Sequence, residues 1–190
     1  WAALVAPGVV LNKDGSFQRS ARFRGPDLDS AVQAELIAVA GRLNSAFRRL
    51  GSGWAIFVEA QRHAVGAYPT SRFPDPASAM VDAERRADFE EDAAHYESSY
   101  FLTFTFLPPA EDAARAESWL YEGKADRGVD AWEALRGFVD RTDRILQLVE
   151  AFMPECGWLD DVETLTYLHS TVSTKRYRVR VPETPMYLDA

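Results

Sequence analysis

Hydrophobic residues recur along the chain with two different periods, and the change from one to the other marks where strands and helices are expected. The short apolar stretch 9–11 and the alternating stretch 16–24 flank the sequence Asn12-Lys13-Asp14-Gly15. Asn and Asp favour turns and Gly15 tolerates a positive φ, so the pattern predicts a β-hairpin. The second arm alternates, and one side carries Phe17, Arg19, Ala21 and Phe23. One packed side and one solvated side are therefore expected.

Three stretches show the three-or-four spacing of amphipathic helices. The first is residues 30–50, for which Asp29 or Ser30 is the expected N-cap. The second is residues 129–153, which Pro154 ends. The third starts at Asp160-Asp-Val-Glu163, a sequence resembling a capping box. These helices predict the main apolar surfaces that must cover a sheet.

Two further strands are predicted between these helices. Residues 54–58 (WAIFV) are typical of a strand buried in a sheet interior, and residues 100–107 (YFLTFTFL) predict a strand covered on both faces. Residues 64–76 are loop-like. Residues 77–97 are helical by propensity but acidic, and we expect them to lie against the surface through one narrow face. That face carries Met80, Ala83, Ala87 and Ala94.

Strands separated by single helices beside a hairpin favour an α+β fold, with a small, largely antiparallel sheet packed against amphipathic helices. We expect these helices on one face of the sheet. Residues 108–130 are expected to form a mobile excursion, because Pro108-Pro109 stops the preceding strand and residues 123–128 are polar and glycine-containing. Near the end, residues 175–181 predict a charged strand that lies at a sheet edge.

Composition narrows the class of protein. The 190 residues are 47% hydrophobic, enough for one well-covered core. Twenty-one Lys and Arg against 29 Asp and Glu give a net charge of -8, which disfavours nonspecific binding to a phosphate backbone. The single cysteine, Cys156, excludes an intramolecular disulfide and a CxxC motif. No apolar run is long enough to span a bilayer.

The sequence motifs of catalysis are missing. Around Gly123-Lys124, Ser118 replaces the leading Gly of a phosphate-binding loop and Ala125 replaces its hydroxyl residue. The three histidines, His63, His95 and His169, have no metal-ligand spacing. We interpret Cys156 as a half-buried small side chain, Asp160-Asp161 as a helix cap, and Glu90-Glu91-Asp92 as a solvated helix face. The sequence therefore predicts no catalytic residue, cofactor site or metal site in this chain.

Positive charge is concentrated in two places, and these residues are the candidate partner-binding residues. The hairpin carries Arg19, Arg22 and Arg24; the stretch near the end carries Lys175, Arg176, Arg178 and Arg180. Three interpretations remain open: charge that protects a strand edge, binding of an acidic partner segment, and contact with nucleic acid.

Three stretches also carry a resemblance to a known family: the opening WAALVAPGVVLNKDGSFQRSARFRGPDLDS, the central LGSGWAIFVEAQRH, and residues 164–190, where TLTYLHSTVS passes into TKRYRVRV and PETPMYLDA. Here the chain resembles the amino-terminal region of the TrbE type of conjugation ATPase, in the CagE/TrbE/VirB family of type IV secretion motors. The matched residues are mostly core, turn and cap positions. The resemblance implies that residues 1–190 form a single amino-terminal domain of a longer ATPase, without its carboxy-terminal RecA-like motor. The start at Trp1 and the stop at Ala190 are accordingly expected to be cuts in a longer polypeptide.

The function that the resemblance implies is a non-catalytic docking and assembly domain. The full-length parent would bind ATP and Mg²⁺ and hydrolyse ATP to power pilus assembly and DNA or protein transfer. Its expected partners are the inner-membrane subunits of the secretion machine, and it is expected to form a hexamer in the cytoplasm, at the cytoplasmic face of the bacterial inner membrane. Membrane contact is expected to be peripheral or through partners. The alternative is a nucleic-acid-binding module that assists conjugative DNA transfer, which the arginine clusters favour and the net charge disfavours.

Overall fold

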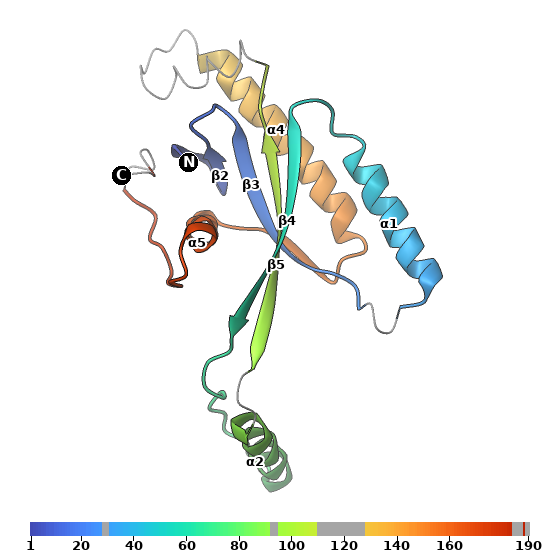
Figure 1. The fold of residues 1–190 in the computed structure, drawn as a ribbon, viewed down its shortest axis with the longest axis vertical. Helices are drawn as coiled ribbons and strands as arrows, with labels where there is room; N and C mark the ends of the chain where they lie inside the picture. Colours follow the sequence, from blue (N-terminus) through green and yellow to red (C-terminus); the bar gives the residue numbers. More distant parts are fainter. Residues whose placement is uncertain (28–30, 92–94, 110–127, 184–187, 189–190) are drawn as a thin grey trace. The chain divides into compact units, whose positions relative to one another are not determined.

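The structure, a computed structural model, describes residues 1–27, 31–91, 95–109, 128–183 and 188. Over these residues, six strands form one sheet (Figure 1). The strands are β1 (Ala3–Ala6), β2 (Val9–Leu11), β3 (Phe17–Arg24), β4 (Trp54–Ala64), β5 (Tyr96–Phe106) and β6 (Glu155–Trp158). The described helices are α1 (Gln33–Phe47), α2 (Pro76–Glu91), α4 (Gly128–Glu150) and α5 (Asp161–Val172). The predicted α+β class is confirmed, and the registered pairs β1–β2, β2–β3, β3–β5 and β3–β6 are all antiparallel.

The predicted hairpin is present as β2 and β3. Its turn is closed by hydrogen bonds from the Gly15 amide to the Asn12 carbonyl (3.0 Å) and from the Asn12 amide to the Ser16 carbonyl (2.8 Å). Gly15 has a φ of 81°, as the turn requires. Asp14 accepts hydrogen bonds from the hydroxyl and amide of Ser16, which lower the pKa of the Asp14 carboxyl. These contacts fix the register in which Leu11 lies opposite Phe17.

β3 is the central strand of the sheet. One edge pairs with β5 from Phe17, opposite Phe106, to Phe23, opposite Tyr100. The other edge pairs first with β2 and then with β6, where Ala21 lies opposite Trp158. The sequence did not predict β6, because its four residues are too few to show a period.

Helices cover both faces of the sheet, so the expectation of helices on one face is wrong. Alternation along β2 shows the two faces: Val9 and Leu11 pack with α4, whereas Val10 packs with α5. On the α4 side, α1 adds partly buried residues to the cluster around Phe104. On the other side, α5 packs beside Phe101 and residues of the carboxy-terminal segment. Figure 1 shows α1 and α4 on one side of the strands and α5 on the other.

β4 is an edge strand, and the prediction that residues 54–58 lie in the sheet interior is wrong. The strand order is β1-β2-β3-β5-β4, which leaves β4 at one end. Phe57 and Val58 are 57% and 66% exposed although they point to opposite faces. Only Trp54 and Ile56 join the core, beside α1 and α4. By contrast, β5 lies between β3 and β4, and the prediction that both of its faces are covered is confirmed by buried Phe101, Leu102, Thr103 and Phe104.

The three amphipathic helices are confirmed as α1, α4 and α5. α5 begins with the predicted capping box: the Glu163 amide donates to the Asp160 carboxylate at 2.7 Å, and the Asp160 amide donates to the Glu163 carboxylate at 3.1 Å. α1 begins after Val32, whose amide donates to the Glu35 carboxylate at 3.2 Å. The expected caps Asp29 and Ser30 lie outside the described residues.

One predicted boundary and one predicted strand are wrong. The helix expected over residues 77–97 ends at Glu91, and β5 begins at Tyr96. Residues 175–181 form no strand: the amide of Val179 donates to Thr166 Oγ1 at 3.0 Å instead of to a neighbouring strand. Val179 and Val181 pack partly against the α5 cluster, while Arg178 and Arg180 are exposed. The predicted alternation of packed and exposed side chains is therefore present, but in an extended segment and not in a strand. Most of the expected excursion, residues 110–127, lies outside the described part of the chain.

The chain divides into two compact units, Trp1–Glu59 with Tyr100–Ala190, and Ala60–Ser99. Within the second unit, α2 packs through Asp82, Arg86 and Phe89, which recur at helical spacing and are its only partly buried residues. Tyr68 contacts all three: it donates to Asp82 at 2.8 Å, lies under the Arg86 guanidinium, and meets the Phe89 ring.

The expected inward face of α2 is therefore the outward face. Met80 is 65% exposed, and Ala83 and Ala87 are exposed too, so the prediction that α2 packs through its apolar side is wrong. Ala94 lies outside the described residues. None of the described helices is both long enough and apolar enough to cross a bilayer.

Candidate functional site

Arg19, a candidate binding residue, is held inside the fold. Its Nη1 donates to Asp143 Oδ1 of α4 at 2.7 Å, and its side chain is only 11% exposed. Its guanidinium lies 4.0 Å from the centre of the Trp158 ring, and Trp158 Nε1 donates to the same Asp143 oxygen at 2.7 Å. Burial lowers the pKa of Arg19, and the bond to Asp143 opposes that shift. The arrangement joins β3, β6 and α4.

Arg22 and Arg24 have different neighbours. Arg22 lies 3.5 Å from the Glu163 carboxylate at the start of α5, and Arg24 lies 3.4 Å from Glu155 of β6. Both side chains are more than half exposed. Arg19 faces α4 whereas Arg22 faces α5, so the hairpin arginines do not form one surface.

The candidate residues near the end, Lys175, Arg176, Arg178 and Arg180, are all exposed. The segment that carries them borders a hollow beside α5, where the Tyr177 ring lies 4.4 Å from that of His169. Arg180 lines this hollow together with apolar side chains that include Leu165, Leu168 and Val172. Whether these cations bind a partner stays a prediction.

Cys156 and the histidines, which could act as a nucleophile or as metal ligands, make contacts within the fold. Burial, with the nearby Glu150 carboxylate, raises the pKa of the Cys156 thiol to about 11, so the thiol is protonated at neutral pH and is a poor nucleophile. His95 stacks on Phe89 at 3.9 Å, and its Nε2 lies 2.8 Å from the Phe89 carbonyl. His63 lies 3.7 Å from Glu97. Across the described residues, no group of three or more His, Cys, Asp or Glu is placed to hold a metal ion.

A polar network crosses the α5 face of the sheet. Tyr167 donates to Glu59 at 2.9 Å and lies 3.3 Å from Thr103 Oγ1, which is 2.8 Å from Ser20 Oγ. Burial raises the pKa of Tyr167 to about 12, so the phenol stays protonated and donates. The network satisfies buried polar groups of β3 and β5, which is a structural role.

Of the acidic candidates, Asp160 and Asp161 have structural roles. Asp160 caps α5, and Asp161 accepts a hydrogen bond from the Gly8 amide at 2.6 Å. Gly8 has a φ of 66°, and a Cβ there would meet the Leu159 carbonyl oxygen. Glu90 and Glu91 belong to α2 with their side chains largely toward solvent, as expected for a solvated helix face. Asp92 lies outside the described residues, as does Gly123-Lys124.

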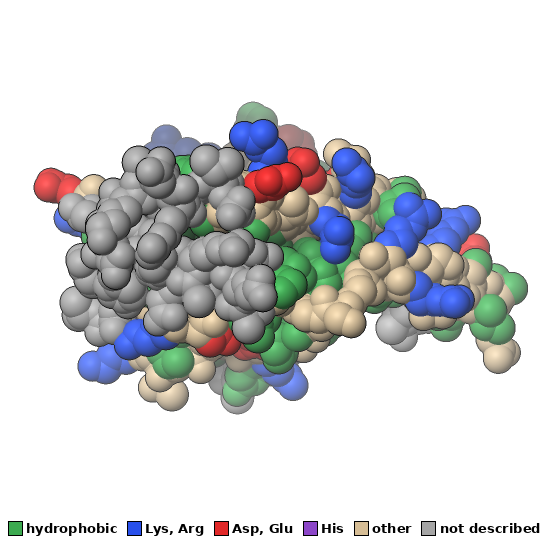
Figure 2. Space-filling view, turned by 90° about the horizontal axis from the view of Figure 1, so that it is seen from above, with side chains coloured by type: hydrophobic (Ala, Val, Ile, Leu, Met, Phe, Trp, Pro, Cys, Tyr) green, Lys and Arg blue, Asp and Glu red, His purple; other side chains and the backbone are tan. Residues whose placement is uncertain are grey.

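Sequence reasoning missed a basic groove between α1 and α4, named here the α1–α4 groove. It has a volume of about 590 Å³, and its lining residues are Ala38, Gly41, Arg42, Ser45, Ala46, Arg49, Leu148, Ala151 and Phe152. Small side chains of α1 make one wall, and Leu148 and Phe152 make the other. Figure 2 shows Lys and Arg side chains gathered over the right-hand end of the view, where α1 lies in Figure 1, with hydrophobic side chains between them. Arg42 of α1 and Arg49, just after α1, are far from α4 in the sequence, so no local sequence pattern indicates the groove.

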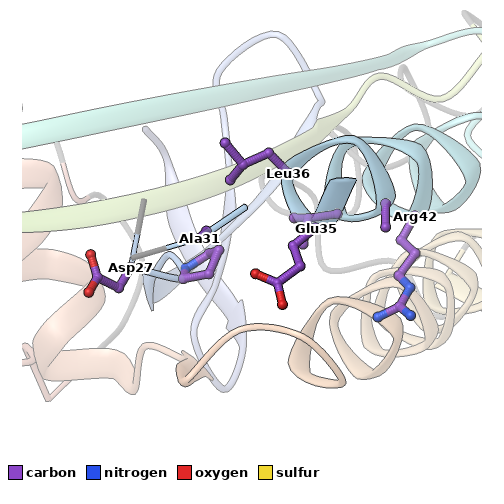
Figure 3. A pocket seen from close by; sticks show the side chains of 8 residues that line it. Asp27, Ala31, Glu35, Leu36 and Arg42 are labelled. Carbon is purple, nitrogen blue, oxygen red and sulfur yellow. The ribbon is translucent and has the colours of Figure 1, made fainter. Parts of the chain in front are cut away.

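A second hollow adjoins the groove at the start of α1. Its lining includes Pro26, Asp27, Ala31, Glu35 and Arg42, so Arg42 borders both hollows. Figure 3 shows Glu35 and Arg42 pointing to the same side of α1, with Leu36 on the other side. The carboxylates of Asp27 and Glu35 offset the charge of Arg42 in this second hollow, whereas the described residues that line the α1–α4 groove include two arginines and no acid.

Comparisons with known proteins identify a family that this chain resembles. Residues 8–114 match the family described as "Type IV secretion system ATPase VirB4/TrbE, N-terminal domain". The chain is 34% identical over 206 residues to the conjugal transfer protein TrbE of Rhizobium radiobacter, a match that covers 100% of this chain and 25% of that relative. It therefore spans about a quarter of that relative's length.

A second relative is similar over more than half of the chain. It is described as the first portion of a probable conjugal transfer protein TrbE from Sinorhizobium fredii (strain NBRC 101917 / NGR234), and it is 42% identical over 111 residues. That match covers 57% of this chain and 74% of the relative.

Proposed function

Because the chain belongs to the VirB4/TrbE amino-terminal domain family of type IV secretion ATPases, we propose that it is a non-catalytic docking and assembly domain of a conjugal transfer ATPase. One observation carries the proposal: four described side chains of types used in catalysis are unreactive or are held in contacts within the fold. Cys156 is protonated, Asp143 holds Arg19, Asp160 caps α5, and Tyr167 closes a buried network.

The surface of the domain supports a binding role. Large apolar side chains stand exposed on β4, and Arg42 and Arg49 line the α1–α4 groove together with mostly apolar residues. Both features are typical of protein contact surfaces. In this proposal, a RecA-like motor elsewhere in the parent binds ATP and Mg²⁺, and the parent works as a hexamer at the cytoplasmic face of the inner membrane, where this domain contacts inner-membrane subunits.

Two assays test the proposal. The purified domain, shown to be folded by circular dichroism, should retain at least one inner-membrane subunit of its own transfer system in a pull-down. It should hydrolyse ATP no faster than a buffer blank. A folded domain that captures none of these subunits would overturn the docking role, and ATP hydrolysis above the blank would overturn the non-catalytic assignment.

A second candidate function is contact with nucleic acid, which the exposed Arg178 and Arg180 favour. The net charge of -8 opposes it. An electrophoretic shift assay near physiological salt separates the two: binding that Arg178→Ala and Arg180→Ala weaken would favour this candidate, while no shift at that salt would reject it.

A further inference from the structure

The outward face of α2 is an acidic and apolar surface that no described residue covers. Met80, Glu84, Ala87 and Glu91 recur at spacings of three or four residues and therefore lie along one side of the helix. All four are exposed, and Met80 is 65% exposed. The opposite side carries the residues that contact Tyr68. α2 thus turns the Met80 side chain and two carboxylates to solvent.

Charge complementarity indicates what covers this face. The unit Ala60–Ser99 contains four arginines and eight Asp and Glu, a net charge of -4, which is half of the chain's -8 in 40 residues. The occupant of the α2 face should therefore be cationic with apolar patches between its charges.

The α1–α4 groove has that chemistry. Arg42 and Arg49 are both exposed and line it, and Arg144, also exposed, precedes Leu148 by one turn of α4. Ala38, Gly41 and Ser45 line the same groove, and their small side chains leave room for an unbranched side chain such as that of Met80. The groove therefore combines positive charge with a largely apolar lining.

Both surfaces carry their charges in pairs. Glu84 and Glu91 are seven residues apart on α2, which is about 10 Å along the helix axis. Arg42 of α1 and Arg49, in the turn after α1, both line the groove, so a helix laid along it presents two carboxylates to two guanidinium groups.

We propose that α2 of one copy of this chain docks along the α1–α4 groove of a second copy, with Glu84 and Glu91 against Arg42 and Arg49. The contact joins two different surfaces, so it is head-to-tail, and repetition produces a ring or an open chain of copies. This contact between copies does not depend on the docking of inner-membrane subunits. Self-association and subunit docking are measured by separate assays.

A charge-swap experiment tests the contact. Sedimentation velocity of the purified chain over a concentration series should show reversible association that weakens as the salt rises from about 0.05 to 0.3 M. E84K/E91K and R42E/R49E should each weaken association at least about tenfold, because each places like charges together. An equimolar mixture of the two variants should restore association, since each then meets an opposite charge.

Matched variants control for net charge. E133K/D140K reverses two exposed acids, also seven residues apart, on α4, and R178E/R180E reverses two exposed arginines of the carboxy-terminal segment. Both should associate like the unmodified chain. M80Q should weaken association while I37Q, at an equally exposed position of α1, should not. A monomer at every concentration, association that survives both charge reversals, or a mixture that stays dissociated would overturn the proposal.

The pull-down keeps the two proposals apart. Capture of an inner-membrane subunit that is unchanged in E84K/E91K, together with failed self-association, rejects this contact and leaves the docking role standing. Restored association in the mixture without capture of any inner-membrane subunit supports this contact and rejects the docking role.

Discussion

Arg19 shows how a charged residue on a predicted strand becomes part of the core. The sequence placed Arg19 on the same side as Phe17 and Ala21, and that alternation is confirmed. Its charge is tolerated there because Asp143 neutralises it and the Trp158 ring covers it. The partner comes from a helix far along the chain, 124 positions from Arg19, so no local pattern could have identified the pair.

Removal of Asp143 should destabilise the fold more than removal of both partners. Asp143→Ala leaves a largely buried guanidinium unpaired, and we expect it to lower the free energy of unfolding by about 2 kcal/mol, less than for a fully buried pair because Asp143 is 41% exposed. The double variant R19M/D143L should recover most of this loss. Arg22→Ala, which breaks an exposed pair, should cost less than about 0.5 kcal/mol. Urea denaturation measures all three, and equal losses for the single and double variants would contradict the account.

Cys156 should react slowly for a partly exposed thiol. Its pKa is raised from 9.0 to about 11, so the native chain holds less thiolate than the unfolded chain at every pH below about 11. A two-unit difference predicts that a disulfide reagent reacts about 100-fold more slowly with native than with urea-unfolded chain at pH 8. The native rate should climb with pH toward 11. Equal rates in the two states would show that the thiol is not shifted.

At the element scale, the contact between the β1–β2 turn and the start of α5 depends on Gly8. Gly8→Ala should lower the free energy of unfolding by at least about 2 kcal/mol, because it strains a positive φ and places a Cβ against the Leu159 carbonyl. Gly137 gives a control with the opposite sign. It lies in α4 with open space at its Cβ position, so Gly137→Ala should stabilise by about 0.5–1 kcal/mol. Thermal unfolding of both variants checks the pair, and a tolerated Gly8→Ala would show that the turn can move.

Elements with strong local signals could be predicted from the sequence. The hairpin turn carries its own hydrogen-bonding residues, and the capping box of α5 lies within four residues. The edge position of β4 could not be predicted, because an apolar run is equally typical of a central strand and of an edge strand that awaits a partner. The strand predicted over residues 175–181 was wrong for a related reason. Alternation shows which side chains are packed, but it does not show whether the backbone has a strand beside it.

Among the candidate binding surfaces, too, only those made of residues close together in the sequence could be predicted. Charged residues near one another in sequence were readily identified, yet the hairpin arginines separate because successive strand residues face opposite sides. The α1–α4 groove is assembled from two helices about 100 residues apart, so it required the fold. α2 misled the sequence reasoning because a cation, a carboxylate and two aromatic rings replaced the expected apolar contact.

At the scale of the whole molecule, burial is distributed unevenly between the two units. α4 buries five large apolar side chains, Leu135, Phe138, Ile145, Leu146 and Val149, whereas α2 buries none. Local stability follows buried apolar surface, so α2 should open without unfolding the rest of the chain. Hydrogen exchange followed by mass spectrometry should find the α2 amides exchanging at least about tenfold faster than those of α4. The reason is that local opening of α2 should need less free energy than opening of α4.

The same measurement links stability to the proposed contact. Docking of α2 into the α1–α4 groove would bury Met80 and pair Glu84 and Glu91, so protection of α2 should rise with protein concentration while protection of α4 stays constant. In R42E/R49E the concentration dependence should vanish, because the groove no longer attracts α2, and the dilute-solution rates of α2 should be unchanged. Protection of α2 that matches α4 even at high dilution would show instead that the contacts around Tyr68 stabilise this helix without a second copy.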